Sequence, residues 1–472
     1  MKQAKFPKDF LWGAALSNVQ AEGAYLEDGK GLTVYDTLIV NHEIENSTIS
    51  DTNVASDHYH HYKEDIDLMA EMGFTAYRFS IVWARIHPNG DDAAPNEKGL
   101  KFYEEMIDYL HLKGIEPIVS LVHFDMPDHL LRKYNGFYNR KVVDLYENHV
   151  RIIANRLKGK VKFWITYNEV NTIRHHSQLV AGAIKPEGVS KAEFLSVLTQ
   201  HTQLAHAKAV LAIKSACPEA NVSGMITFGM TYPISPKPCD VRAANMINNF
   251  VYYLTFDVMV FGKYPDYYKA YMKNRKISLN YSVNDMKTIK QASRKLDFLS
   301  VSYYQTGTAH GYETSDPIEE EDLILFGNDT LVRNPYLKTN EWGWQIDPEG
   351  FRTTLSSLHQ RYHKPIFVVE NGIGIDEKLN EQMTVEDDQR IAYQRSHIEN
   401  MLKSIILDGS KIIGYLAWAP IDFLSSHKEM RKRYGFVYIN RTDYELKDLK
   451  RYRKKSFFWY KKVIASNGSK LD

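Results

Sequence analysis

The sequence predicts a single-domain (β/α)8 TIM barrel that fills residues 1–472. Eight short apolar runs recur along the chain, and long amphipathic segments separate them. The runs are near-continuously apolar rather than alternating, which is typical of parallel strands buried on both faces. No Gly-, Pro- or Ser-rich linker divides the chain. A doubly wound sheet is the competing fold, but no GxGxxG motif follows an early predicted strand.

The predicted strands and helices alternate in the order that such a barrel requires. The strands are predicted at 10–16 (FLWGAAL), 76–81 (AYRFSI), 115–123 (IEPIVSLVH), 162–169 (KFWITYNE), 221–229 (NVSGMITFG), 296–304 (LDFLSVSYY), 365–372 (PIFVVENG) and 412–419 (IIGYLAWA). Helical patterns are predicted at 98–114, 139–160, 191–216, 387–409 and 456–468. Several end in Lys-Gly or Asp-Gly, a common helix stop. The segment 305–345 is expected to be a long loop after the sixth strand.

Composition restricts the function classes. The chain is 44% hydrophobic and 25% charged, with a net charge of +1. This balance argues against nucleic-acid and anionic-membrane partners. The first thirty residues carry charges throughout and resemble no secretory signal, and no apolar run approaches the roughly 18 residues of a membrane span. We therefore expect a cytoplasmic protein and leave a homo-oligomer open.

No metal or cofactor is expected. Cys217 and Cys239 are the only cysteines and lack metal-site spacing. The histidine cluster HYHHY (58–62) lacks the acidic partner of an HExxH motif. We expect these histidines to lie on a helix surface.

Polar and aromatic residues occupy the predicted carboxyl ends of the strands, where active sites of such barrels gather. They are His123, Asn168, Glu169, Tyr303, Tyr304, Glu370, Asn371 and Trp418, with Gln20 just past the first strand. A buried glutamate is costly unless a cation pairs with it or it performs chemistry. Two carboxyl groups among such residues suit glycosidic cleavage, in which one protonates the leaving oxygen while the other attacks or activates water. Two structural ion pairs are the alternative.

TYNEV (166–170) and VVENG (368–372) resemble the acid/base and nucleophile motifs of family 1 glycoside hydrolases. The resemblance extends from FLWGAALSNVQAEG (10–23) to SFFWYKKVIASNG (456–468). It implies a retaining double displacement in which Glu370 is the nucleophile and Glu169 the acid/base. The charge of Glu370 would keep Glu169 protonated until glycosylation. Retention implies carboxyl groups about 5–5.5 Å apart.

The resemblance also implies supporting residues. Arg78 would hold the nucleophile ionised and Tyr304 would donate a hydrogen bond to it, while Ser302 stands where the family usually has Asn. The residues that match positions holding the sugar ring are Gln20, His123, Asn168 and Trp418. Trp344, in the segment after the sixth strand, is expected to be a platform for the aglycone, the group that leaves. Core packing is the alternative for His123 and Tyr304, and a surface aromatic is the alternative for Trp344.

The window WAPIDFLSSHKEMRKRYGF (418–436) points to the sugar. Ser425 stands where β-glucosidases of this family have a glutamate that binds the sugar, and Ser426 stands in place of their Trp. A carboxylate would repel a 6-phosphate, whereas the Ser425 hydroxyl, the Lys432 ammonium and the Tyr434 phenol can donate to it. The window therefore resembles the 6-phospho-β-glycosidase branch, and Ser426 favours the gluco configuration. Whether Ser425 or Ser426 binds the phosphate stays open.

The expected substrate is a phosphorylated β-glucoside, such as cellobiose 6-phosphate or an aryl β-glucoside 6-phosphate, cleaved to glucose 6-phosphate. Alternative functions are a 6-phospho-β-galactosidase, a β-glucosidase for unphosphorylated sugars, and a catalytically silent sugar-phosphate-binding sensor. A solvated basic loop is the alternative reading of the phosphate residues.

Overall fold

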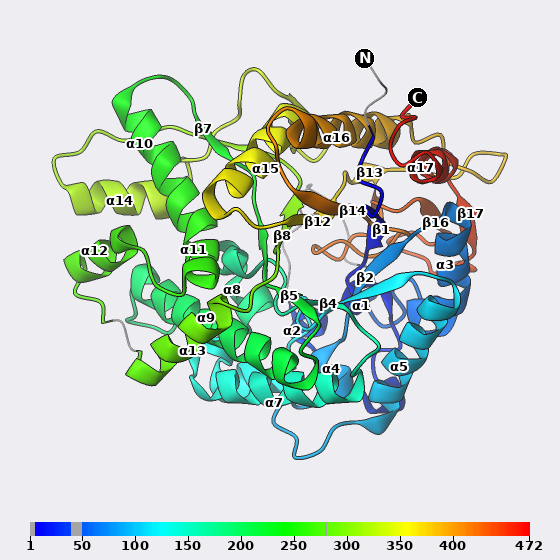
Figure 1. Ribbon diagram of the computed structural model, residues 1–472, viewed down its shortest axis with the longest axis horizontal. Coiled ribbons are helices and arrows are strands. Elements are labelled where there is room, and N and C mark those ends of the chain that lie inside the picture. The colour runs from blue at the N-terminus through cyan, green and yellow to red at the C-terminus, as the bar shows by residue number, and fades with distance from the viewer. Residues whose placement is uncertain (1–4, 39–49, 279–280) are drawn as a thin grey trace.

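A parallel barrel forms the centre of the computed structural model, which describes residues 5–38, 50–278 and 281–472 (Figure 1). Its sheet order is β5-β4-β3-β2-β1-β14-β12-β8-β6. β5 (Asn221–Ser223) and β6 (Met225–Thr227) are separated only by Gly224, so the two ends of this order belong to one run and the barrel closes. The predicted barrel is confirmed.

The remaining barrel strands fall inside the predicted runs. They are β1 (Leu11–Ala15), β2 (Ala76–Ser80), β3 (Glu116–Ser120), β4 (Phe163–Ile165), β8 (Leu299–Tyr303), β12 (Ile366–Asn371) and β14 (Ile412–Trp418). Every residue of β2, β8 and β12 is buried, as parallel strands covered on both faces require. The first and last strands, β1 and β14, pair in parallel and close the ring on that side.

Helices surround the strands (Figure 1). The longer ones are α3 (His58–Met72), α5 (Glu97–Leu112), α7 (Lys141–Arg156), α9 (Lys191–Ala216), α10 (Pro238–Ile247), α13 (Val283–Ser293), α14 (Pro317–Phe326), α15 (Pro348–Tyr362), α16 (Asp388–Ile406) and α17 (Lys455–Ala465). The predicted helices correspond to α5, α7, α9, α16 and α17, with ends that differ by a few residues. Within the described residues, no helix is both long enough and apolar enough to span a membrane.

Shorter elements decorate the barrel. The helices are α1 (Asn18–Ala21), α2 (Val34–Thr37), α4 (Trp83–Ile86), α6 (Asp128–Tyr134), α8 (Ile173–Ala181), α11 (Leu254–Phe261) and α12 (Asp266–Asn274). The strands are β7 (Thr231–Pro233), β9 (Gly307–Ala309), β10 (Lys338–Thr339), β11 (Gln345–Ile346), β13 (Ile375–Asp376), β15 (Lys432–Arg433), β16 (Val437–Ile439) and β17 (Arg451–Arg453).

The segment 305–345 is not the plain loop that was expected, because it contains β9, α14 and β10. Asp316 caps α14 by accepting a hydrogen bond from the Ile318 amide at 2.8 Å, and Pro317 occupies the first helical position. Glutamates in the first turn also suit the positive end of the helix dipole. The helix therefore depends on its N-terminal residues rather than on apolar periodicity.

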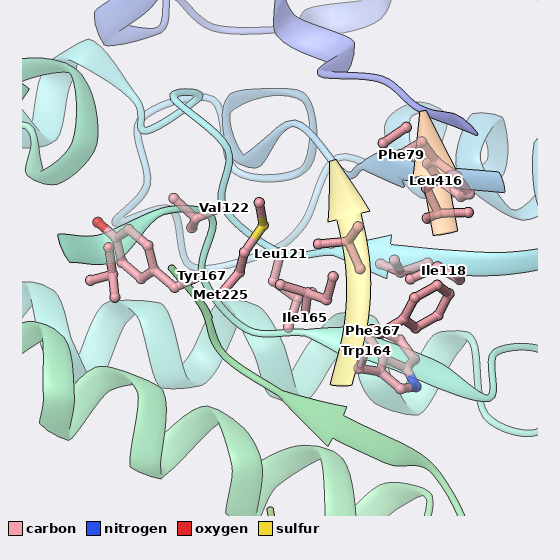
Figure 2. Packing of buried hydrophobic residues seen from close by; sticks show 14 of the residues in the cluster. Phe79, Ile118, Leu121, Val122, Trp164, Ile165, Tyr167, Met225, Phe367 and Leu416 are labelled. Atoms are coloured by element: carbon pink, nitrogen blue, oxygen red, sulfur yellow. The ribbon is translucent and has the colours of Figure 1, made fainter. Parts of the chain in front are cut away.

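The barrel is a packed core rather than a pore. Figure 2 shows buried apolar side chains from several strands in contact, among them Ile118, Trp164, Phe367 and Leu416. This packing leaves the carboxyl ends of the strands as the place where polar side chains can gather.

The histidine cluster begins α3, and the expectation for it was partly wrong. His60 is exposed and His61 is partly exposed, as expected for a helix surface. His58 is instead fully buried, with its Nδ1 2.7 Å from the Asp65 carboxylate two turns along the helix. Arg451 also binds Asp65 at 2.9 Å, so His58 belongs to a buried structural network.

Candidate active site

Glu370 lies near the end of β12 and is almost fully buried, with 2% of its surface exposed. The register of β12 against β8 shifts between Val368 and Glu370, and such a bulge re-aims a side chain. The Arg78 guanidinium, from β2, forms an ion pair with one carboxylate oxygen. The Tyr304 hydroxyl donates to the other at 2.8 Å. Both residues therefore contact the carboxylate that they were expected to support.

Arg78 is itself held in place. Its Nε donates to the Ser120 hydroxyl at 2.8 Å, and its Nη2 donates to the Asn168 side-chain oxygen at 2.6 Å. Asn168 precedes Glu169, so the guanidinium connects the segments that carry the two glutamates.

Glu169 follows β4 in a left-handed backbone conformation, with φ of 39° and ψ of 43°. A non-glycine residue in this region is strained, and such strain concentrates at functional sites. The Ser302 hydroxyl donates to the Glu169 carboxyl at 2.5 Å. Because Ser302 and Tyr304 are two residues apart, the end of β8 contacts both glutamates.

The surroundings give the two carboxyl groups different acidities. Burial raises the pKa of Glu169 to about 8, and the charge of Glu370 adds to this shift. Burial also raises the pKa of Glu370, but the charge of Arg78 and hydrogen bonds from Arg78 and Tyr304 oppose that shift. Glu169 is therefore suited to hold a proton at neutral pH, while the contacts of Glu370 favour its ionised form.

A cavity of about 820 Å³ opens above the two glutamates. The expected site residues that line it are Gln20, His123, Glu169, Tyr304, Trp344, Glu370, Trp418, Ser425 and Tyr434. Arg78, Asn168 and Lys432 are not part of the lining. Arg78 binds Glu370 and Asn168 accepts a hydrogen bond from Arg78. The Lys432 ammonium lies 4.2 Å from the ring centre of Trp344.

The residues expected to hold the sugar ring retain unused hydrogen-bonding atoms. His123 Nδ1 and Asn168 Nδ2 are buried, and neither has a hydrogen-bond partner within the described residues. The His123 ring stacks on Trp418 with centroids 5.7 Å apart, and burial lowers the pKa of His123 well below its ordinary value. Gln20 donates to the Leu424 carbonyl at 2.8 Å. Buried polar atoms rarely stay unpaired, so those of His123 and Asn168 suit the hydroxyl groups of a ligand.

Two of the three residues expected to bind phosphate, Ser425 and Tyr434, line the cavity, and Lys432 lies next to Tyr434. The Ser425 hydroxyl accepts hydrogen bonds from the amides of His427 and Glu429, each at 3.2 Å, which leaves its own hydrogen for another acceptor. Lys432 is buried, and its ammonium lies over Trp342 as well as Trp344.

The side chains of Lys432 and Tyr434 both pack against Gly374. A Cβ atom added at Gly374 would lie 2.8 Å from Lys432 Cγ and 3.1 Å from Tyr434 Cζ, so the two side chains are close neighbours. Ser426 lines the cavity beside Ser425, so the lining does not choose between these two serines.

Several lining residues were not anticipated from the sequence. His427 borders the cavity, with its Nδ1 3.3 Å from the Ser426 hydroxyl. A consecutive polar run from α8 also lines it, from His175 to Gln178. Asp125, in the motif HFDMPDHL, does not line the cavity. Its carboxylate accepts hydrogen bonds from the backbone amides of His123 and Trp83 and so positions the segment that carries His123.

Comparison with known proteins finds relatives that match nearly the whole chain. The family model described as glycosyl hydrolase family 1 matches residues 2–469. The chain is 41% identical to an aryl-phospho-β-D-glucosidase of Bacillus subtilis (strain 168) and 42% identical to a phospho-cellobiase of Klebsiella oxytoca, with 99% of each chain covered. The structure of a family 1 β-glucosidase from Thermotoga maritima matches with a TM-score of 0.84 and 30% identity over 99% of both chains.

Proposed function

The chain belongs to glycosyl hydrolase family 1, and we propose that it is a retaining 6-phospho-β-glucosidase that releases glucose 6-phosphate from phosphorylated β-glucosides. The names of two relatives, which are 41% and 42% identical to this chain, support this choice: aryl-phospho-β-D-glucosidase and phospho-cellobiase. We also propose that residues 1–472 form one domain, since the family model spans nearly all of them.

In the proposed mechanism, Glu370 attacks the anomeric carbon while Glu169 protonates the departing oxygen. The bond to the aglycone breaks and an ester forms between Glu370 and the sugar. Glu169, now a carboxylate, takes a proton from water, which attacks the same carbon and releases Glu370. The raised pKa of Glu169 supports the acid role, and the ion pair with Arg78 supports the nucleophile role of Glu370.

The observation that carries the phosphate preference is a serine hydroxyl at position 425 on the cavity wall, with Lys432 and Tyr434 nearby. A dianionic phosphate there would meet neutral donors and an ammonium instead of a carboxylate. Ser426, in place of a Trp next to Ser425, favours the gluco epimer. Phosphorylated disaccharides typically form as sugars enter the cell, so we place the enzyme in the cytoplasm.

The test compares kcat/KM for three p-nitrophenyl substrates: the β-glucoside 6-phosphate, the β-galactoside 6-phosphate and the unphosphorylated β-glucoside. We expect the first to be cleaved fastest. Faster cleavage of the unphosphorylated compound would point to an ordinary β-glucosidase, and faster cleavage of the galacto epimer would point to a 6-phospho-β-galactosidase. Binding of the phosphorylated sugars without release of nitrophenol would favour a sensor.

A further inference from the structure

The α8 segment forms one wall of the cavity in an unusual way. Five consecutive residues, His175 to Leu179, all line the cavity, and the first four of them are polar. Successive side chains of a regular helix point about 100° apart, so four in a row cannot share one wall. The backbone of His176 leaves the helical conformation, with φ of −131° and ψ of 46°. This kink allows the consecutive side chains to reach the same cavity.

The chemistry of this α8 wall, defined as His175, His176, Ser177 and Gln178, is polar. It offers two imidazoles, a hydroxyl and an amide. Arg174 does not join it, because its guanidinium donates to the Leu325 carbonyl at 2.5 Å and lies over Phe326.

The protonation state of the wall suits hydroxyl recognition. His175 is exposed to the solvent of the cavity, but desolvation by the surrounding protein, together with the charges of Arg174, His176 and Lys191, lowers the pKa of its ring to about 4. At neutral pH the ring is therefore uncharged and can both donate and accept a hydrogen bond.

The position of the wall identifies what it faces. α8 begins four residues after Glu169, the group that must reach the oxygen between the sugar and its aglycone. The expected phosphate residues come from another part of the chain, the segment 425–434. The nearness of α8 to Glu169 is the observation that assigns the α8 wall to the part of the cavity beyond the departing oxygen. Trp344, Phe124 and Tyr252 add apolar surface to the same cavity, and a sugar presents both hydroxyl groups and apolar faces.

We propose that the α8 wall selects a hydroxyl-rich leaving group, such as a second sugar, over an aryl group. This inference rests on the proposed function and specifies its substrate class. A site built to hydrogen-bond hydroxyl groups discriminates against a ligand that lacks them, because its own polar groups then lose water without gaining partners. His175 and Gln178 are the specificity-determining residues under this proposal.

The experiment measures kcat and KM for cellobiose phosphorylated on its non-reducing glucose and for phenyl β-glucoside 6-phosphate. The variants are His175→Ala and Gln178→Ala, with His175→Asn as the conservative replacement. His60→Ala, which changes an exposed histidine on α3, is the matched control. We expect each alanine variant to lower kcat/KM for the disaccharide about tenfold, mainly through KM, and to change the phenyl substrate less than twofold. His175→Asn should recover part of the loss.

Unchanged activity toward the phenyl substrate also reports that the variants are folded. Equal losses on both substrates, or no loss on the disaccharide in either variant, would overturn the role of the wall while leaving the proposed function intact. If the wild-type enzyme cleaved neither phosphorylated compound, the proposed function would fail and this inference with it.

Discussion

Replacement of Ser302 by alanine should move the pH profile in a known direction. The Ser302 hydroxyl donates to the Glu169 carboxyl at 2.5 Å in a buried site, and this bond lowers the pKa of Glu169 against the effects of burial and of Glu370. Its loss destabilises the carboxylate form, so the pKa rises and the acid form persists to higher pH.

The magnitude follows from the difference between the two protonation states. A hydrogen bond to a charged group contributes about 1.5–3 kcal/mol and a neutral one about 0.5–1.5 kcal/mol. The difference of about 1–1.5 kcal/mol corresponds to about one pKa unit at roughly 1.36 kcal/mol per unit. The basic limb of kcat/KM should therefore move from near pH 8, the pKa of Glu169, to about pH 9.

The assay follows kcat/KM against pH with phenyl β-glucoside 6-phosphate, whose leaving group needs a proton. Only the basic limb is diagnostic, because the substrate phosphate titrates near pH 6. Ser120→Ala is the matched control, since Ser120 contacts Arg78 at 2.8 Å rather than Glu169, and it should leave the basic limb in place. If the basic limb of Ser302→Ala lies at the same pH as that of the wild type, or at a lower pH, the reasoning is refuted.

Three other substitutions test the remaining assignments. Glu370→Gln should lower kcat by more than about 1,000-fold; unchanged sugar release would show that another group is the nucleophile. Lys432→Ala should raise KM for the phosphorylated glucoside by about 10- to 100-fold, because a buried charge-assisted contact is lost. It should barely change KM for the unphosphorylated glucoside. The control Lys98→Ala, at an exposed position, should barely change KM for either substrate. An equal loss on the two substrates would refute the phosphate role of Lys432. Ser425→Glu should lower kcat/KM for the phosphorylated glucoside by more than about 100-fold through charge repulsion, and a retained phosphate preference would exclude Ser425 from the phosphate site.

The barrel could be predicted because strands buried on both faces leave near-continuous apolar runs, and all eight runs became barrel strands. Residues at the ends of those runs, such as Glu169 and Glu370, were placed at one edge of the barrel by that topology alone. The helix α14 was missed because it depends on the cap at Asp316 and on Pro317 rather than on an apolar stripe.

Features that depend on pairing or on distant contacts could not be predicted. The bulge at Glu370 exists only in the register of β12 against β8. The placement of Lys432 over Trp342 and Trp344 joins segments almost ninety residues apart. The α8 wall was missed because the kink at His176 breaks helical periodicity. The run HHSQ, soon after the acid/base motif, was its only sign in the sequence.

The most direct test of the account is a crystal structure of the glycosyl-enzyme trapped with 2-deoxy-2-fluoro-β-glucosyl fluoride 6-phosphate. The account predicts a covalent bond from the anomeric carbon to Glu370. It also predicts that the 6-phosphate accepts hydrogen bonds from Ser425 or Ser426, Lys432 and Tyr434. A covalent bond to another residue, or a phosphate directed away from this side of the cavity, would contradict it.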